Sequence, residues 1–155
     1  HERVGLAALS GLTERLLDDV TTWSRVTPSG GPNGEKMIDV PWVQSDLAKC
    51  HALLDAIRLM TWKLAQSVAD NTLGPAEASG VKVFGTEKAV EVYRIMQGIL
   101  GPVSHLRDGS PGTVIHGEVE RAARAAQINT FGGGVNEIQR ELVATAGLGL
   151  VRSTR

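Results

Sequence analysis

The sequence predicts an all-α fold, an antiparallel up-and-down bundle of the four-helix type with an extra short helix at its C-terminal end. Apolar residues recur at helical spacing over four long segments. No run alternates cleanly between apolar and polar residues, as a half-buried strand would, and stretches rich in Gly and Pro separate the helical segments. With 155 residues, of which 42% are apolar, the chain suits one domain with a single core.

The first three helices follow from this spacing. The first is expected over residues 2–23, where apolar residues lie three, four or seven apart: Leu6, Leu9, Leu16, Val20 and Trp23. A loop with two Pro and three Gly follows at residues 26–34 and cannot continue the helix. The second helix should begin near Pro41, a residue well tolerated in a first turn, and end around residues 71–74. The third should run over residues 75–100.

The C-terminal part predicts two shorter helices. A loop rich in turn residues covers residues 101–117, and a fourth helix is expected over residues 118–130. The triplet Gly132–Gly134 ends it. A last helix should cover residues 135–146, with Gly147 as its C-cap. Long amphipathic helices joined by irregular loops pack as an antiparallel bundle.

Charge and composition argue against several classes of protein. The formal net charge is −1 with acids and bases interspersed, whereas a nucleic-acid binder shows a basic patch. Apolar runs are too short to span a membrane, and no signal peptide is visible. Cys50 is alone, so we expect a buried, inert thiol and a reducing, cytoplasmic location. None of the four His has a metal-ligand spacing with Cys or a second His.

Four segments in series carry a resemblance. They are HERVGLAAL at 1–9, ASGVKVFGTEKAVEV at 78–92, ILGPVSHL at 99–106 and INTFGGGVNEIQRELVATAGLGL at 128–150. Together they resemble the C-terminal helical domain of FAD-dependent acyl-CoA dehydrogenases, in the right order and over nearly the whole chain. The resemblance implies that residues 1–155 are this domain, without the family's N-terminal helical and β-sheet domains. We therefore expect this fragment to be inactive by itself.

The resemblance also implies a reaction. The family introduces a double bond between Cα and Cβ of an acyl-CoA thioester: a carboxylate removes the α-proton, FAD takes the β-hydride, and electrons pass to an electron-transfer flavoprotein. Hydrogen bonds to the thioester carbonyl acidify the α C–H. An apolar pocket raises the pKa of the carboxylate base toward the useful range. The family's bundles pack against each other, so a homo- or hetero-oligomer is implied.

The base departs from the commoner family pattern. Most members carry a Glu in the loop before the last helix, at the position that Gly133 occupies here. A minority, similar to isovaleryl-CoA and long-chain acyl-CoA dehydrogenases, carry it on the first helix of this domain, and Glu2-Arg3 matches that placement. The resemblance thus implies Glu2 as the catalytic base, Arg3 as its organising neighbour and the Gly133 N–H as a donor to the thioester. As an alternative for Glu2, the helix dipole alone favours a Glu in a first turn.

The cofactor contacts implied by the resemblance are mixed. Arg25 matches an Arg that reaches the FAD pyrophosphate of a neighbouring subunit, and Thr27 matches a polar contact; a solvated surface Arg is the alternative. Gln97 and Gly101 lie in a turn that touches the adenosine end of FAD across an interface. Gln97 is one residue out of register, however, and Pro102 replaces a Gly and has no N–H.

The last signature departs from the family pattern too. Glu137 matches a flavin contact, whereas Val135 replaces a Thr and lacks its hydroxyl. With these losses the sequence resembles a subgroup of actinobacterial-looking family members that pair two unlike subunits. Some members of this subgroup act on steroid side-chain thioesters. Three hypotheses stay open: part of an enzyme with Glu2 as its base, a non-catalytic partner subunit or assembly module, and an unrelated helical bundle.

Overall fold

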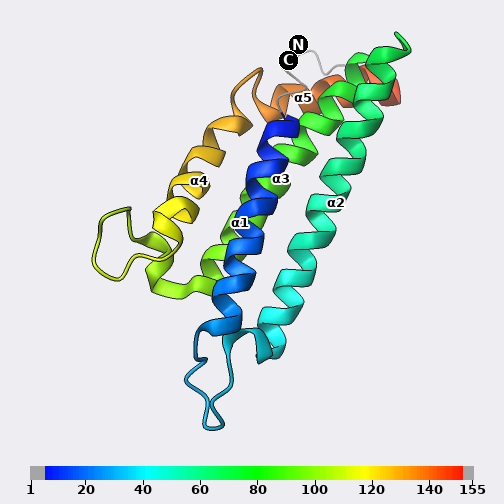
Figure 1. Cartoon of the computed structure of the whole chain (residues 1–155). Coiled ribbons are helices and arrows are strands. Elements are labelled where there is room, and N and C mark those ends of the chain that lie inside the picture. The colour runs from blue at the N-terminus through cyan, green and yellow to red at the C-terminus, as the bar shows by residue number, and fades with distance from the viewer. Residues whose placement is uncertain (1–5, 152–155) are drawn as a thin grey trace.

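The structure, a computed structural model, describes residues 6–151. Four helices form an up-and-down bundle, and a shorter helix lies across one end of it (Figure 1). Their bounds are α1 Leu6–Val26, α2 Pro41–Ala69, α3 Pro75–Leu100, α4 Glu118–Ala126 and α5 Asn136–Leu142. Within residues 6–151 the only extended pairing is an isolated bridge between Pro28 and Lys36. The prediction of an all-α bundle with an extra short helix is confirmed.

The helix boundaries mostly agree with the sequence pattern. α2 begins at Pro41 and α3 at Pro75, in each case with Pro in the first turn, where no helical hydrogen bond needs its N–H. α1 continues to Val26, three residues beyond the predicted end at Trp23. α4 is followed directly by a 3-10 turn, Gln127–Thr130, so the helical segment ends where it was predicted.

The end of the C-terminal helix differs from the prediction. After Leu142 the chain continues as a π-helical turn, Val143–Gly147, and Leu148 is its capping residue. Gly147 therefore lies inside the turn, and the prediction that it is the C-cap is wrong. A Cβ at Gly147 would lie 2.9 Å from the Cβ of Ala76 at the start of α3. The glycine thus permits a close approach of two segments rather than a left-handed cap.

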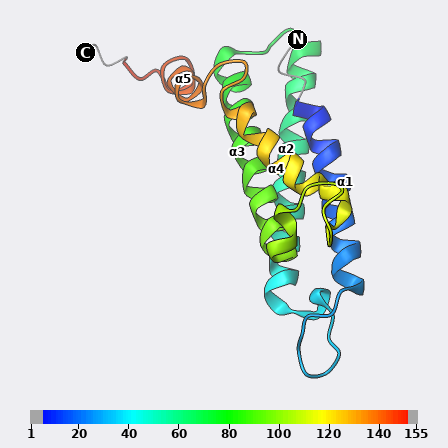
Figure 2. The ribbon, with the colours of Figure 1, turned by 90° about the vertical axis from the view of Figure 1, so that its left-hand side faces the viewer.

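α3 is the centre of the bundle. It packs against α1, α2, α4 and α5, and Figure 2 shows α5 running crosswise beside the first turns of α3. The largest fully buried apolar side chains are Leu16, Leu17, Val20, Val43, Cys50, Leu64, Val92, Met96 and Ile99. Cys50 is fully buried, as predicted, and burial raises the pKa of its thiol to about 12. No helix within residues 6–151 has the length and apolar character that crossing a membrane requires.

Candidate functional site

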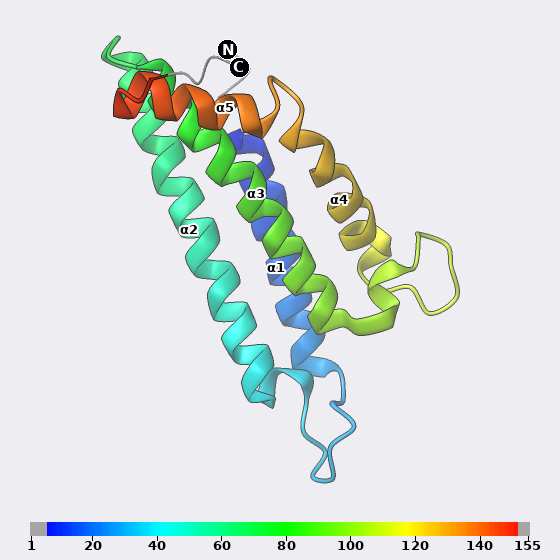
Figure 3. The same cartoon turned by 180° about the vertical axis from the view of Figure 1, so that it is seen from behind.

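The predicted site residues lie at the two ends of the bundle. Arg25, Thr27, Gln97 and Gly101 lie where α1 and α3 finish, whereas Gly133, Val135 and Glu137 lie at the opposite end (Figures 1 and 3). α1 has 21 residues and is therefore roughly 30 Å long. One chain does not bring the two sets together. The predicted catalytic pair, Glu2 and Arg3, lies outside the described residues, but α1 begins at the same end as Gly133.

The segment Phe131–Val135, which we call the glycine loop, connects the turn after α4 to α5. Gly133 and Gly134 have φ values of 66° and 103°, a region that side chains other than hydrogen disfavour. A Cβ at Gly134 would lie 2.5 Å from Nε2 of Gln139, which is 4% exposed. Among the described residues, the N–H groups of Gly133 and Gly134 have no hydrogen-bond acceptor. The loop therefore presents two open donors at an exposed position.

A buried lysine of α3 holds the glycine loop in place. Lys82 is 7% exposed, and its Nζ donates to Thr130 O at 3.0 Å, Gly134 O at 2.7 Å and Asn136 Oδ1 at 2.6 Å. These three acceptors match the three N–H bonds of an ammonium group. Burial lowers the pKa of Lys82 from its ordinary value, and the negative charges of Glu137 and Glu87 act in the opposite direction.

Asn136 and Arg140 join α5 to α3 next to this lysine. Asn136 Nδ2 donates to Thr86 Oγ1 at 3.1 Å and to Glu87 Oε1 at 3.0 Å, and Arg140 Nη2 donates to Glu87 Oε2 at 2.6 Å. Although burial raises the pKa of Glu87, the hydrogen bonds from Arg140 and Asn136 hold it below its ordinary value. Lys82 and Glu87 thus anchor both the glycine loop and the first turns of α5 on α3.

Reasoning from the sequence missed this anchor. Asn136 occupies a position that the signature treats as variable, and Lys82 was not singled out. A signal was present in the sequence. Lys82 lies four residues after Ala78 and four residues before Thr86, and both of these residues are on the buried face of α3. A lysine on such a face needs buried acceptors, and only the fold shows that the glycine loop supplies them.

The surface around the glycine loop is apolar. Ile128, Phe131, Val135 and Ile138 are 66%, 61%, 38% and 50% exposed, respectively. Below them, the buried Oε1 of Gln139 meets no donor within the part of the chain that the structure describes. Solvent-exposed apolar groups beside open backbone donors suit the binding of an amphipathic ligand or of another protein segment.

Arg25 and Thr27 lie at the other end of the bundle, just before the loop to α2. The guanidinium of Arg25 is exposed and makes no ion pair with any described carboxylate. It is free to meet an anion of another molecule, although a basic residue in the last turn is also favoured by the helix dipole. Thr27 is half-buried, and its backbone bonds Trp23 and Met37. An exposed guanidinium without an ion-pair partner among the described residues fits a phosphate contact.

The turn at Gly101 fits a cofactor less well. Gly101 has φ 66°, and its N–H donates to Gln97 O as the cap of α3. The next residue, Pro102, has no N–H. Neither backbone nitrogen is therefore available to a ligand. The groups of this turn that could still contact a cofactor are the half-buried side chain of Gln97 and backbone carbonyls. No group of three or more His, Cys, Asp or Glu side chains within residues 6–151 is placed to hold a metal ion.

Comparison with known proteins identifies relatives over the whole chain. Residues 1–148 match the family model for the acyl-CoA dehydrogenase C-terminal domain. The chain is 43% identical to acyl-CoA dehydrogenase FadE26 of Mycobacterium tuberculosis over 158 aligned positions, which cover 100% of this chain and 39% of that protein. It is 30% identical to FadE29 of the same organism, again over 100% of this chain and 38% of the relative.

Solved structures show the same similarity. A structure described as the Tcur3481-Tcur3483 steroid ACAD superposes with a TM-score of 0.89 at 46% identity, over 99% of this chain and 38% of that chain. The ChsE4-ChsE5 complex from Mycobacterium tuberculosis gives a TM-score of 0.84 at 43% identity, over 91% of this chain and 36% of that chain. The chain thus spans about two fifths of the length of these relatives.

Proposed function

The chain belongs to the acyl-CoA dehydrogenase family, as its C-terminal domain, and from that membership we propose that it is part of a flavoenzyme that desaturates an acyl-CoA thioester. The observation that supports this most is the glycine loop, whose two open N–H donors lie among exposed apolar side chains. Backbone donors of this kind stabilise the negative charge that develops on a thioester oxygen when the α-proton leaves.

In the proposed mechanism Glu2 removes the α-proton and keeps it on its carboxylate. The Gly133 N–H donates to the thioester carbonyl, which makes the α C–H more acidic. Arg3 orients Glu2. FAD, when bound, supplies the hydride acceptor for the β-carbon. Two features support Glu2 as base: the loop position that commonly holds a Glu is Gly133, and α1 begins at the same end of the bundle as the glycine loop (Figure 1).

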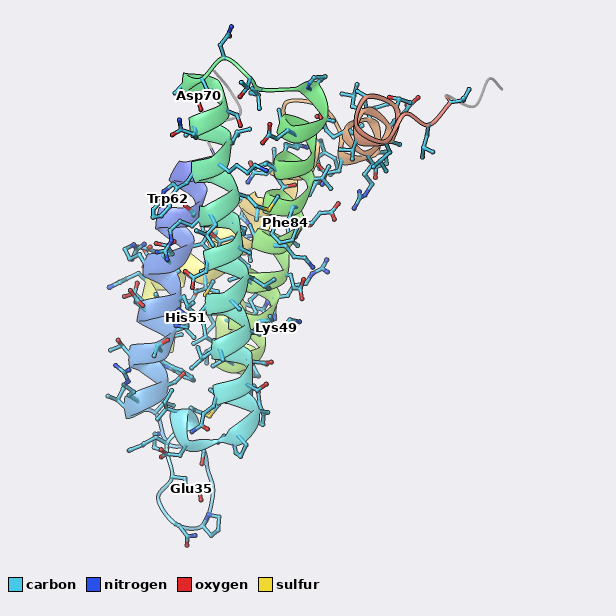
Figure 4. The ribbon with its side chains drawn as sticks, turned by 90° about the vertical axis from the view of Figure 1, so that its right-hand side faces the viewer. Glu35, Lys49, His51, Trp62, Asp70 and Phe84 are labelled. Atoms are coloured by element: carbon cyan, nitrogen blue, oxygen red, sulfur yellow. The ribbon has the colours of Figure 1, made fainter. Side chains whose placement is uncertain are left out.

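The separation of the predicted FAD contacts supports an oligomer. Val135 and Glu137 lie at one end of a bundle whose first helix is roughly 30 Å long, and Arg25 lies at the other. In the proposed assembly, the residues at each end serve a different FAD molecule, one of them bound mainly by a neighbouring subunit. Leu59 and Trp62 on α2 are exposed and offer apolar contact area for such packing. Trp62 is labelled in Figure 4. Two relatives are named as pairs, Tcur3481-Tcur3483 and ChsE4-ChsE5, which favours an unlike partner.

We propose a steroid side-chain thioester as the substrate class, because a relative at 46% identity is described as a steroid ACAD. The electron acceptor that the family implies is an electron-transfer flavoprotein. Both assignments concern a whole enzyme, and this chain spans about two fifths of the length of the relatives.

A non-catalytic partner subunit is the second candidate. The turn at Gly101 favours it, because neither Gly101 nor Pro102 offers an N–H to the adenosine end of FAD. In this case the domain supplies packing surface to a subunit that carries the working flavin site.

One experiment separates the two candidates. The full-length protein is purified alone and with its partner, and the flavin absorbance and the oxidation of a steroid acyl-CoA are measured. If this subunit is part of an active enzyme, the amount of bound FAD should include one FAD for the glycine-loop site of this subunit. Turnover that survives disruption of that site through Gly133→Pro, which removes its N–H, would support the partner role instead.

A further inference from the structure

We propose that Lys82 is a positioning residue for the thioester: its ammonium fixes the glycine loop and so sets the direction of the Gly133 N–H. This inference rests on the proposed function, because it needs Gly133 to contact the thioester carbonyl. Lys82 belongs to α3, and in the proposed mechanism it does not contact the thioester itself.

The geometry of the three hydrogen bonds supports this role. Lys82 Nζ bonds the carbonyl of Thr130, just before the glycine loop, and that of Gly134, its last glycine. The third bond, to Asn136 Oδ1, fixes the first residue of α5. One atom thus joins both ends of a segment that contains Gly133. The ammonium itself is fixed because α3 packs against the four other α-helices.

The composition of the loop explains why such an anchor is needed. Three successive glycines have no side chains that could pack and restrict the backbone, and glycine loses more conformational freedom than any other residue when it becomes ordered. An N–H that stabilises developing charge must already be oriented before the reaction, because reorientation during the reaction costs free energy. Lys82 supplies that order from a side chain that is 7% exposed.

The charge of Lys82 adds a second contribution. Its three partners are neutral oxygen atoms, and no carboxylate among the described residues lies within ion-pair distance of Nζ. The ionisable groups that face it are Glu87 of its own helix and Glu137 of α5, and Glu87 is already bound to Arg140. A positive charge that is hydrogen-bonded to the loop favours negative charge on an oxygen atom that the loop binds.

The test compares two ligands that differ at one position. The full-length, FAD-loaded protein is titrated with the CoA thioester of an α,β-unsaturated steroid carboxylic acid, the product of the proposed reaction, which cannot reduce the flavin, and with the matching S-alkyl-CoA thioether, which lacks the carbonyl oxygen. Flavin absorbance reports binding. We expect Lys82→Met to weaken thioester binding about tenfold and to leave thioether binding unchanged, and to lower kcat by about a hundredfold, the scale of one lost oxyanion donor. General loosening of the fold would weaken both ligands equally.

Lys88→Met is the matched control, because Lys88 lies on the same helix, is more exposed and pairs with Glu91 rather than with the loop. Asn136→Ala is the second variant, for the case that Lys82→Met does not fold. It removes the acceptor nearest to Nζ while keeping the ammonium, and we expect the same selective loss at smaller size.

The two ligands distinguish a failure of the proposed function from a failure of the proposed role of Lys82. If the unmodified protein binds thioester and thioether equally, Gly133 does not contact the carbonyl, and both the proposed function and this inference are wrong. If it prefers the thioester and the Lys82 and Asn136 variants keep that preference and kcat, the proposed function stands and the role of Lys82 is refuted.

Discussion

Gly134→Ala is the substitution whose effect the structure defines most directly. At φ 103° an alanine is strained, and its Cβ would lie 2.5 Å from Nε2 of Gln139, a side chain too buried to swing into solvent. Strained backbone of this kind costs about 1–3 kcal/mol. For a chain of this size, 1 kcal/mol shifts Tm by about 2–4 °C, so a cost of about 2 kcal/mol lowers Tm by about 4–8 °C.

The assay is thermal unfolding of the 155-residue chain followed by circular dichroism. Gly98→Ala is the matched control, because Gly98 lies inside α3 and a Cβ there meets no atom within 4 Å. Alanine is favoured over glycine in a helix interior by about 1 kcal/mol, so this variant should unfold at a higher temperature. If Gly134→Ala is as stable as the unmodified chain, the glycine loop does not adopt the conformation described.

Two further predictions concern titratable groups. Because burial raises the pKa of Cys50 to about 12, a thiol reagent at pH 8 should leave the folded chain unlabelled and label it fully in denaturant; rapid labelling of the folded chain would contradict the packing of α2. Lys49 and Lys88 donate to Glu91 and hold its pKa at about 2, below the ordinary 4.5. These partly exposed pairs therefore stabilise the folded chain above pH 4.5 and lose that contribution, less than about 1 kcal/mol, as the pH falls towards 2. With Glu91→Gln, Tm should fall less between pH 4.5 and 2 than it does in the unmodified chain. An equal fall in Tm for both chains would show that the pairs contribute nothing.

The bundle was predictable because its signals are local. Leu16, Leu17 and Val20 line the buried face of α1, and the Pro residues that open α2 and α3 mark their first turns. The π-helical turn at Val143–Gly147 was not predictable in this way. Gly147 in this turn lies close to Ala76, a residue more than seventy positions earlier in the chain, and this proximity exists only in the folded chain.

Some residues of the candidate site were likewise predictable from the local sequence, and others were not. Gly133 was predicted by counting along a signature, which needs no three-dimensional information. Lys82 and Glu87 were missed because their partners, Gly134, Asn136 and Arg140, lie about fifty residues away and meet them only in the folded chain. The opposite placement of Arg25 and Glu137 could be inferred only once the direction of each helix was known.

The role of Glu2 is the central claim, and anaerobic rapid mixing tests it most directly. Full-length, FAD-loaded protein with Glu2→Gln is mixed with a steroid acyl-CoA, and loss of flavin absorbance is followed. Glu35→Gln, in the exposed loop between α1 and α2 (Figure 4), is the control. We expect flavin reduction to slow by at least about a hundredfold in the Glu2 variant, the usual contribution of a general base, with substrate still bound. Reduction at the rate of the Glu35 control would show that another group removes the proton.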